Sequence, residues 1–143
     1  MKKRILFLCT GNSCRSQMAE GLINNDFADT VDAFSAGTEP HGLNPTAIAV
    51  MAELGIDISR NSSDHISVYE GQPFDYVITL CGDANEKCPL FFGGVKRLHM
   101  GFDDPPKAKG SPEEILGTYR RVRDEIRKQI GDFLRAELEE HGN

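Results

Sequence analysis

The chain has 143 residues, a formal net charge of −6, 39% hydrophobic residues and 27% charged residues, which fits one globular domain over residues 1–143. The acidic balance argues against a nucleic-acid or anionic-membrane partner, since both surfaces depend on clustered Lys and Arg, and it means that local donors must hold any small anion. No run approaches the roughly 20 apolar residues of a membrane span, and the apolar run at residues 5–8 is too short for a signal peptide, so we expect a cytoplasmic protein, acting as a monomer.

The segment at residues 9–16, Cys-Thr-Gly-Asn-Ser-Cys-Arg-Ser, directly follows this apolar run. A strand that ends at Cys9 and a helix that starts around Ser16 leave the intervening backbone N–H groups available to surround a tetrahedral oxyanion. Gly11 permits a tight turn, and Arg15 supplies a planar fork of donors. The positive charge of Arg15 and the N–H groups of the loop favour the thiolate form of Cys9, which is our predicted nucleophile. The predicted oxyanion-binding loop comprises Thr10, Gly11, Asn12, Ser13, Cys14, Arg15 and Ser16.

Ser16 has two expected roles in this loop. Its hydroxyl can donate a hydrogen bond to the Cys9 thiolate, and its place at the start of a helix is typical of an N-cap. Cys14 is expected to be a small packed group inside the loop.

Alternating helix and strand patterns continue along the chain. Apolar residues at helical spacing predict a helix over residues 17–27, and a short strand is predicted at residues 31–35. Asn44 followed by Pro45 predicts the cap and first position of a second helix, which stops at Gly55.

The second half of the chain continues the same alternation. The apolar run at residues 76–80 predicts a strand buried on both faces, and residues 95–99 predict a weaker one. The loop at residues 100–110 contains an Asp-Pro-Pro sequence that excludes helix. Ser111 as cap and Glu114 three residues later form a capping box that starts the last helix. Its basic residues alternate with acidic ones, so we expect a solvated face at Arg120, Arg121, Arg123, Arg127 and Lys128.

Strands that alternate with helices predict an α/β fold with a parallel sheet and helices on both faces. We predict a flavodoxin-like three-layer sandwich with four strands in the order 2-1-3-4. In this order the first and third strands are neighbours about 4.8 Å apart. The switch point lies at their C-terminal ends, where such sheets bind ligands. Cys9 and Cys81 are therefore expected to meet at one site.

An Asp in the predicted 100–110 loop is the candidate general acid, because thiolate attack on an oxyanion needs a proton delivered to the departing oxygen. Asp104, directly before Pro105, is the favoured residue, and Asp103 is the alternative.

Cys81 and Cys88 flank a second informative segment, Cys-Gly-Asp-Ala-Asn-Glu-Lys-Cys. In a reducing compartment they are expected to be catalytic or free rather than permanently bridged. If the segment is helical, they lie up to about 10.5 Å apart, beyond the roughly 7 Å that a disulfide spans. The segment would then have to unwind before they could pair.

Three segments carry a resemblance to a known family. Residues 9–16, continued by Gln-Met-Ala-Glu-Gly, resemble the active-site loop of the low-molecular-weight tyrosine phosphatase superfamily, and more closely that of its thioredoxin-coupled arsenate reductases. Residues 101–105 resemble the acid loop of that family, and residues 81–89 resemble the redox segment of the reductases.

The resemblance implies an arsenate reductase with a three-cysteine relay. Cys9 attacks arsenate, and Asp104 protonates the leaving oxygen. Cys81 then attacks Cys9, which releases arsenite and forms an intermediate Cys9–Cys81 disulfide. Cys88 attacks Cys81, and thioredoxin reduces the resulting Cys81–Cys88 disulfide.

The resemblance further implies no tightly bound cofactor, but a potassium ion that supports the loop. Its oxygen ligands would come from Asn12, Glu20, Ser35, Ser62 and Asp64, with Ser62 at a position that is often Thr in the family.

Two other functions remain open. A tyrosine phosphatase would share the loop and the acid, although here no aromatic residue follows Asp104-Pro105 to stack on a phosphotyrosine ring. A non-catalytic anion-binding module would need neither Cys81 nor Cys88. Weak phosphatase activity is expected alongside the reductase, because the loop recognises any tetrahedral oxyanion.

Overall fold

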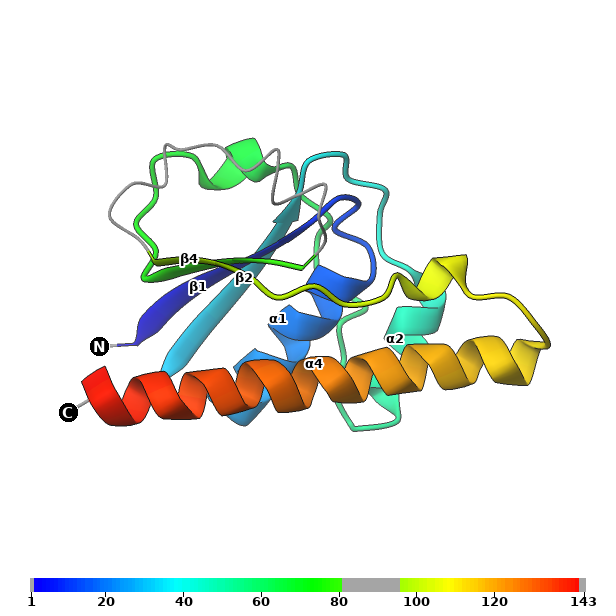
Figure 1. Cartoon of the computed structure of the whole chain (residues 1–143). Coiled ribbons are helices and arrows are strands. Elements are labelled where there is room, and N and C mark those ends of the chain that lie inside the picture. The colour runs from blue at the N-terminus through cyan, green and yellow to red at the C-terminus, as the bar shows by residue number, and fades with distance from the viewer. Residues whose placement is uncertain (1, 81–95, 142–143) are drawn as a thin grey trace.

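The computed structural model describes residues 2–80 and 96–141. Their four strands form one parallel sheet in the order β2-β1-β3-β4 (Figure 1), so the predicted order 2-1-3-4 is confirmed. The strands are β1 (Lys3–Cys9), β2 (Val31–Gly37), β3 (Tyr76–Thr79) and β4 (Lys96–His99).

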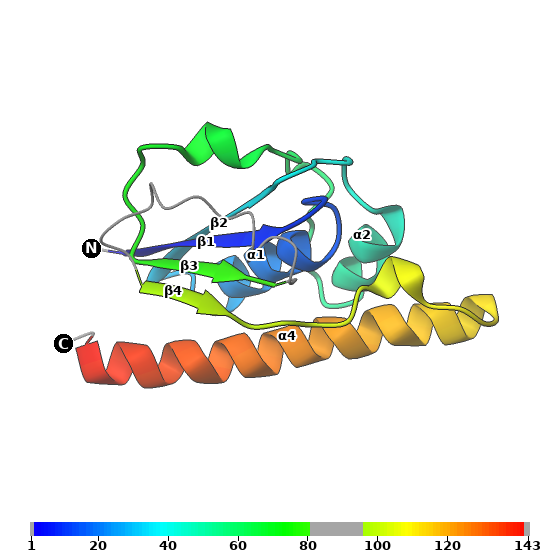
Figure 2. The ribbon, with the colours of Figure 1, turned by 45° about the horizontal axis from the view of Figure 1, so that its top comes forward.

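The α-helices of the described ranges lie on one face of this sheet, and a short 3-10 turn lies on the other (Figures 1 and 2). No helix among the described residues is long and apolar enough to cross a membrane. The helices are α1 (Arg15–Asp26), α2 (Pro45–Ala52) and α4 (Pro112–His141), and the 3-10 turns are η1 (Ile66–Tyr69), on the face opposite the helices, and η2 (Pro105–Lys107).

Two helix starts follow the predicted capping chemistry. The Asn44 side chain accepts hydrogen bonds from the N–H groups of Thr46 and Ala47, at 2.8 and 3.1 Å. Ser111 and Glu114 bond each other's backbone N–H groups at 3.2 and 3.3 Å. Each bond satisfies an N–H that has no partner inside its helix.

The core is centred on β1, the second strand of the sheet. Its side chains at residues 5–8 are almost fully buried, as the predicted apolar run requires of a strand covered on both faces. On the helix side, α4 contributes Val122, Ile126 and Ile130, which are inaccessible to solvent. At about 1.5–3 kcal/mol for each fully buried aliphatic side chain, this stripe holds α4 against the sheet and α1.

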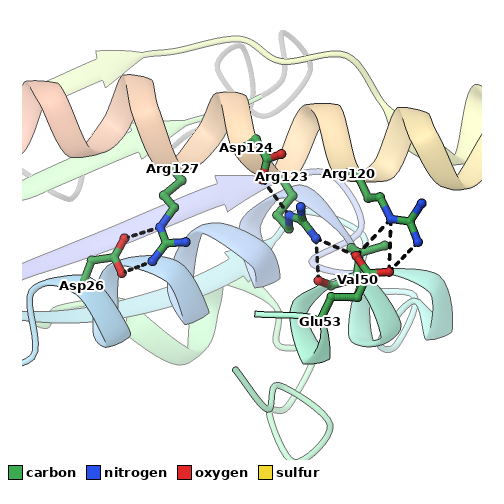
Figure 3. Close-up of polar contacts among 7 residues, drawn as sticks. All are labelled: Asp26, Val50, Glu53, Arg120, Arg123, Asp124 and Arg127. Atoms are coloured by element: carbon green, nitrogen blue, oxygen red, sulfur yellow. Dashed lines mark hydrogen bonds and ion pairs between the residues drawn. The ribbon is translucent and has the colours of Figure 1, made fainter. Parts of the chain in front are cut away.

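Ion pairs also fasten α4 to α2 (Figure 3). Arg123 is only 7% exposed, and it donates to the Val50 carbonyl at 2.8 Å and to Glu53 at 2.9 Å. Arg120 binds both carboxylate oxygens of Glu53. Hydrogen bonds from Arg120 and Arg123 lower the pKa of Glu53 to about 2.

A second ion pair fastens α4 to α1: Arg127 binds both oxygens of Asp26 at 2.8 Å (Figure 3). The prediction of a solvated basic face is therefore wrong for Arg123, which is buried; Arg120 and Arg127 remain exposed in part, although each is ion-paired. These partners are not apparent from the sequence, because Glu53 follows α2 and Asp26 ends α1, far from α4 along the chain.

Candidate active site

The loop between β1 and α1 turns its backbone N–H groups toward one centre. The carbonyls of Thr10, Gly11 and Ser13 accept N–H bonds of 2.8 to 3.1 Å from the segment at residues 39–44. In a trans peptide the N–H points opposite to the C=O. Each carbonyl that is held outward therefore turns the N–H of the next residue toward the inside of the loop, as a bound oxyanion requires.

Asn12 is the residue that makes the turn. Its φ of 44° is left-handed, the only such value for a non-glycine residue in the described ranges. Asn adopts this conformation more readily than most residues. Its fully buried side chain accepts from the Asp64 N–H at 2.7 Å and donates to Ser16 Oγ at 2.9 Å, which fixes the loop from two sides.

Gly11 has a different role from the predicted one, since its φ is not left-handed. A Cβ at Gly11 would lie 2.6 Å from Cδ2 of His41, so a larger residue there would require this exposed imidazole to move. The turn assigned to Gly11 belongs to Asn12.

Cys9 ends β1 and is 3% exposed. Its Sγ lies 2.9 Å from Ser16 Oγ. Either atom of this pair can be the donor, and because Ser16 Oγ also accepts a hydrogen bond from Asn12, its hydroxyl proton is available for the sulfur. The predicted capping role is wrong: Ser16 is the second residue of α1, and Cys14 stands at the N-cap without a side-chain cap bond.

Cys14 behaves differently from Cys9 although it lies in the same loop. Burial raises the pKa of the Cys14 thiol, and the charges of Cys9 and Asp104 raise it further. The thiol therefore stays protonated at neutral pH and fills space, as predicted.

The loop that follows β4 brings one carboxylate to Arg15. Arg15 donates to the Phe102 carbonyl at 3.0 Å, and its Nη2 lies 3.6 Å from Oδ1 of Asp104. Asp103 instead points outward to Arg121 at 3.0 Å, with 73% of its side chain exposed against 27% for Asp104. This geometry favours Asp104 over Asp103 as the acid.

The two loops lie at the same end of the sheet (Figure 2). Their residues line a cavity of about 870 Å³. Its wall includes Cys9, Arg15, Asp104 and Leu80. Leu80 directly precedes Cys81 in the sequence. Cys81 and Cys88 lie outside the described residues, so the expected approach of Cys81 to Cys9 stays a prediction.

The predicted potassium ligands form two hydrogen-bonded groups, Ser35 with Glu20 and Ser62 with Asp64 and Asn12. Ser35 donates to Glu20 at 2.7 Å, and Ser62 donates to Asp64 at 2.6 Å. Asp64 is in turn bonded to Asn12 through its backbone N–H. Burial raises the pKa of Glu20, and the charge of Asp64 adds to this effect while the Ser35 hydrogen bond opposes it. A cation between the two carboxylates would relieve their repulsion, and the donors are the oxygen atoms that such an ion prefers.

Two residues that support the loop are missed by sequence reasoning. Gln17, fully buried, donates to the Asn12 carbonyl at 3.1 Å and to the Ser62 carbonyl at 2.8 Å. Asn44 was expected only as a cap, but its backbone N–H also holds the Ser13 carbonyl. A polar Gln on the buried face of a helix is the one signal available for Gln17, and Asn44 offers none beyond its cap pattern.

Comparisons with known proteins agree with this geometry. The sequence model of the family "Low molecular weight phosphotyrosine protein phosphatase" matches residues 4–143. The arsenate reductase of Shouchella clausii is 55% identical over 132 residues, 92% of this chain and 95% of that protein. The arsenate reductase of Bacillus subtilis is 53% identical over 131 residues, which are 92% of this chain and 94% of that protein.

A solved structure described as an arsenate reductase in the phosphate binding state is similar over 94% of this chain and 98% of its own. Its TM-score is 0.81 and its sequence identity is 33%. The oxyanion loop, the sheet order and the family match over nearly the whole sequence lead to one conclusion: the chain belongs to the low molecular weight phosphotyrosine protein phosphatase family.

Proposed function

We propose that the protein is an arsenate reductase that thioredoxin regenerates. The observation that carries this proposal is the placement of Cys9: its sulfur lies 2.9 Å from the Ser16 hydroxyl oxygen, inside a loop whose carbonyls accept hydrogen bonds from a neighbouring segment. Relatives more than half identical over most of the chain are named arsenate reductases. Leu80, one residue before Cys81, lines the same cavity as Cys9.

In the first step the Cys9 thiolate attacks the arsenic atom of arsenate and forms a sulfur–arsenic bond. One arsenate oxygen leaves as water, taking a proton from Asp104. Arg15 and the inward N–H groups of the loop bind the remaining oxygens and offset their negative charge.

The second step supplies two electrons. The Cys81 thiolate attacks Cys9 Sγ and forms a Cys9–Cys81 disulfide, while the sulfur–arsenic electron pair stays on arsenic, which leaves as arsenite. The Cys88 thiolate then attacks Cys81, which frees the Cys9 thiolate and leaves a Cys81–Cys88 disulfide. The dithiol of thioredoxin reduces that disulfide. Support for this step comes from the sequence of residues 81–89 and from the relatives.

We propose weak hydrolysis of small aryl phosphates as a side activity, since it needs only the loop and the acid. A main role in phosphotyrosine hydrolysis is disfavoured by the sequence that follows Asp104-Pro105, because residues 106–109 contain no aromatic side chain to stack on a substrate ring. The described residues that line the cavity include Phe102 but no Tyr or Trp.

The reaction requires reduced thiols, so we place it in the cytoplasm, with the protein acting as a monomer. Potassium would be held by the two hydrogen-bonded groups around Glu20 and Asp64. It would neutralise buried charge and so support the Asn12 turn. Unfolding in urea should therefore need more denaturant in potassium chloride than in sodium chloride, and Glu20→Gln should abolish the difference. An equal midpoint in both salts for the unaltered protein would rule out this ion.

The function is tested by arsenite release in the presence of thioredoxin, thioredoxin reductase and NADPH. The unaltered protein should release arsenite repeatedly, and Cys9→Ser should release none. Cys81→Ser should release none either, yet it should still hydrolyse an aryl phosphate, which shows that its loop is intact. Arsenite release by Cys81→Ser at the unaltered rate would overturn the relay, and no release by the unaltered protein would overturn the function.

A further inference from the structure

The protein has to bind a dianion while its own net charge is −6. Such a charge repels an approaching oxyanion at long range. Most basic side chains on the helix face are already bound to carboxylates, for example Arg120 to Glu53 and Arg127 to Asp26. Attraction at the cavity must therefore come from a cation that remains available there.

The cavity contains ionisable groups that largely cancel in pairs. Asp103 is bound to Arg121, and Asp104 faces Arg15. A Cys9 thiolate then leaves one uncompensated negative charge in the wall. The ionisable residues among the described ones that line the cavity are Cys9, Cys14, Arg15, His41, Asp103, Asp104 and Lys107, of which Cys14 stays neutral.

Lys107 is the cation that offsets this charge. Within the described ranges its ammonium group takes part in no ion pair, and its side chain is exposed. It lines both the main cavity and a smaller cavity of about 410 Å³ outside the acid loop. Its charge therefore lies on the wall of the same cavity as Cys9.

The backbone holds Lys107 in a fixed relation to the acid. It ends the turn η2, and its N–H donates to the Asp104 carbonyl at 3.0 Å. Pro105 and Pro106 precede it and restrict the backbone of this turn. The turn therefore fixes the backbone of Lys107 next to Asp104, while the flexible lysine stem lets the ammonium group reach an anion in the cavity.

We propose that Lys107 recruits the substrate: its charge draws dianionic tetrahedral oxyanions into the cavity and selects them over neutral molecules of similar size. The choice of arsenate as the oxyanion rests on the proposed function. The recruitment of an anion to Cys9 does not, and the two can be tested separately.

The test compares alkylation of Cys9 by iodoacetate, an anion, and by iodoacetamide, its neutral analogue. Mass spectrometry of the Cys9 peptide gives both rates in the unaltered protein and in Lys107→Gln. Lys128→Gln is the matched control, because it changes the net charge equally but removes an exposed lysine of α4 that pairs with Asp132 and lines neither cavity.

At about 10 mM ionic strength, the ratio of the iodoacetate rate to the iodoacetamide rate should fall roughly two- to tenfold in Lys107→Gln. It should not change in Lys128→Gln. The difference should disappear at about 1 M salt, where the screening length is near 3 Å. The dissociation constant for inorganic phosphate should rise by a similar factor in Lys107→Gln at low salt.

Equal ratios in Lys107→Gln and Lys128→Gln at low salt would overturn the recruitment role. A fall that persists undiminished at high salt would also overturn it, because a change of packing rather than of charge would then be responsible. If the ratio falls as expected but the unaltered protein releases no arsenite, recruitment stands and the proposed function fails.

Discussion

Gly37→Ala should destroy oxyanion binding although the residue lies outside the loop. Gly37 ends β2 opposite Cys9, and its N–H donates to the Asp64 carbonyl at 2.8 Å. A Cβ added there would lie 2.5 Å from the Thr10 carbonyl oxygen and 2.8 Å from the Asn12 nitrogen. Both are backbone atoms, which no side-chain rotation can move away.

The methyl group must therefore displace either the loop or the end of β2. Forcing extra carbon into a closely packed site typically costs about 1–3 kcal/mol. The same displacement moves the N–H groups that surround the anion. Phosphate affinity should fall at least tenfold, since a hydrogen bond to a charged group contributes about 1.5–3 kcal/mol and several are misplaced at once.

Urea unfolding measures the loss of stability in Gly37→Ala, and phosphate titration measures its loss of affinity. Gly117→Ala is the control: Gly117 lies inside α4, and nothing lies within 4 Å of its Cβ position. This change should stabilise the protein by about 0.5–1 kcal/mol, because alanine favours a helix over glycine, and should leave phosphate affinity unchanged. Gly37→Ala with unaltered phosphate affinity would refute the packing of β2 against the loop.

Three further predictions concern single side chains. Asp104→Asn should slow the first chemical step by about a hundredfold to ten-thousandfold, while phosphate still binds. Asp103→Asn should change the rate of this step little. The opposite ranking in single-turnover kinetics would reassign the acid. Ser16→Ala should slow alkylation of Cys9 by iodoacetamide near neutral pH about tenfold, because a hydrogen bond to the thiolate is lost; an unchanged rate would contradict the assigned donor. Hydrogen bonds from its arginine partner lower the pKa of Asp26, so this pair stabilises the fold above the ordinary aspartate pKa, and the stabilisation is lost as the pH falls through the lowered value. Asp26→Asn should therefore destabilise the protein in urea at about pH 7 and less toward pH 3, and an equal loss at both would contradict the ion pair.

Sequence patterns predict the structural features that depend on residues close together along the chain. The strand order follows from alternating strands and helices with short connections, and the caps at Asn44 and Ser111 follow from bonds within three residues. The loop at residues 9–16 was also predictable, because each of its positions has a recognisable chemical role.

Contacts between distant segments were not predictable. The sequence predicts a turn at Gly11, but the left-handed residue is Asn12, and His41 from another loop lies against Gly11. The sequence favours Asp104 over Asp103 only through the proline that follows it, whereas the structure separates them by their partners, Arg15 and Arg121. The basic face of α4 was assigned to solvent because Glu53 and Asp26, its partners, lie some 70 to 100 residues earlier.

The central claim, reduction of arsenic by a second thiol, is tested most directly in Cys88→Ser treated once with arsenate. Arsenite and disulfide-linked peptides are then measured in the same sample by mass spectrometry. We predict about one arsenite released per protein chain and a trapped Cys9–Cys81 disulfide. Release of arsenite with Cys9 and Cys81 both remaining as free thiols would contradict the claim.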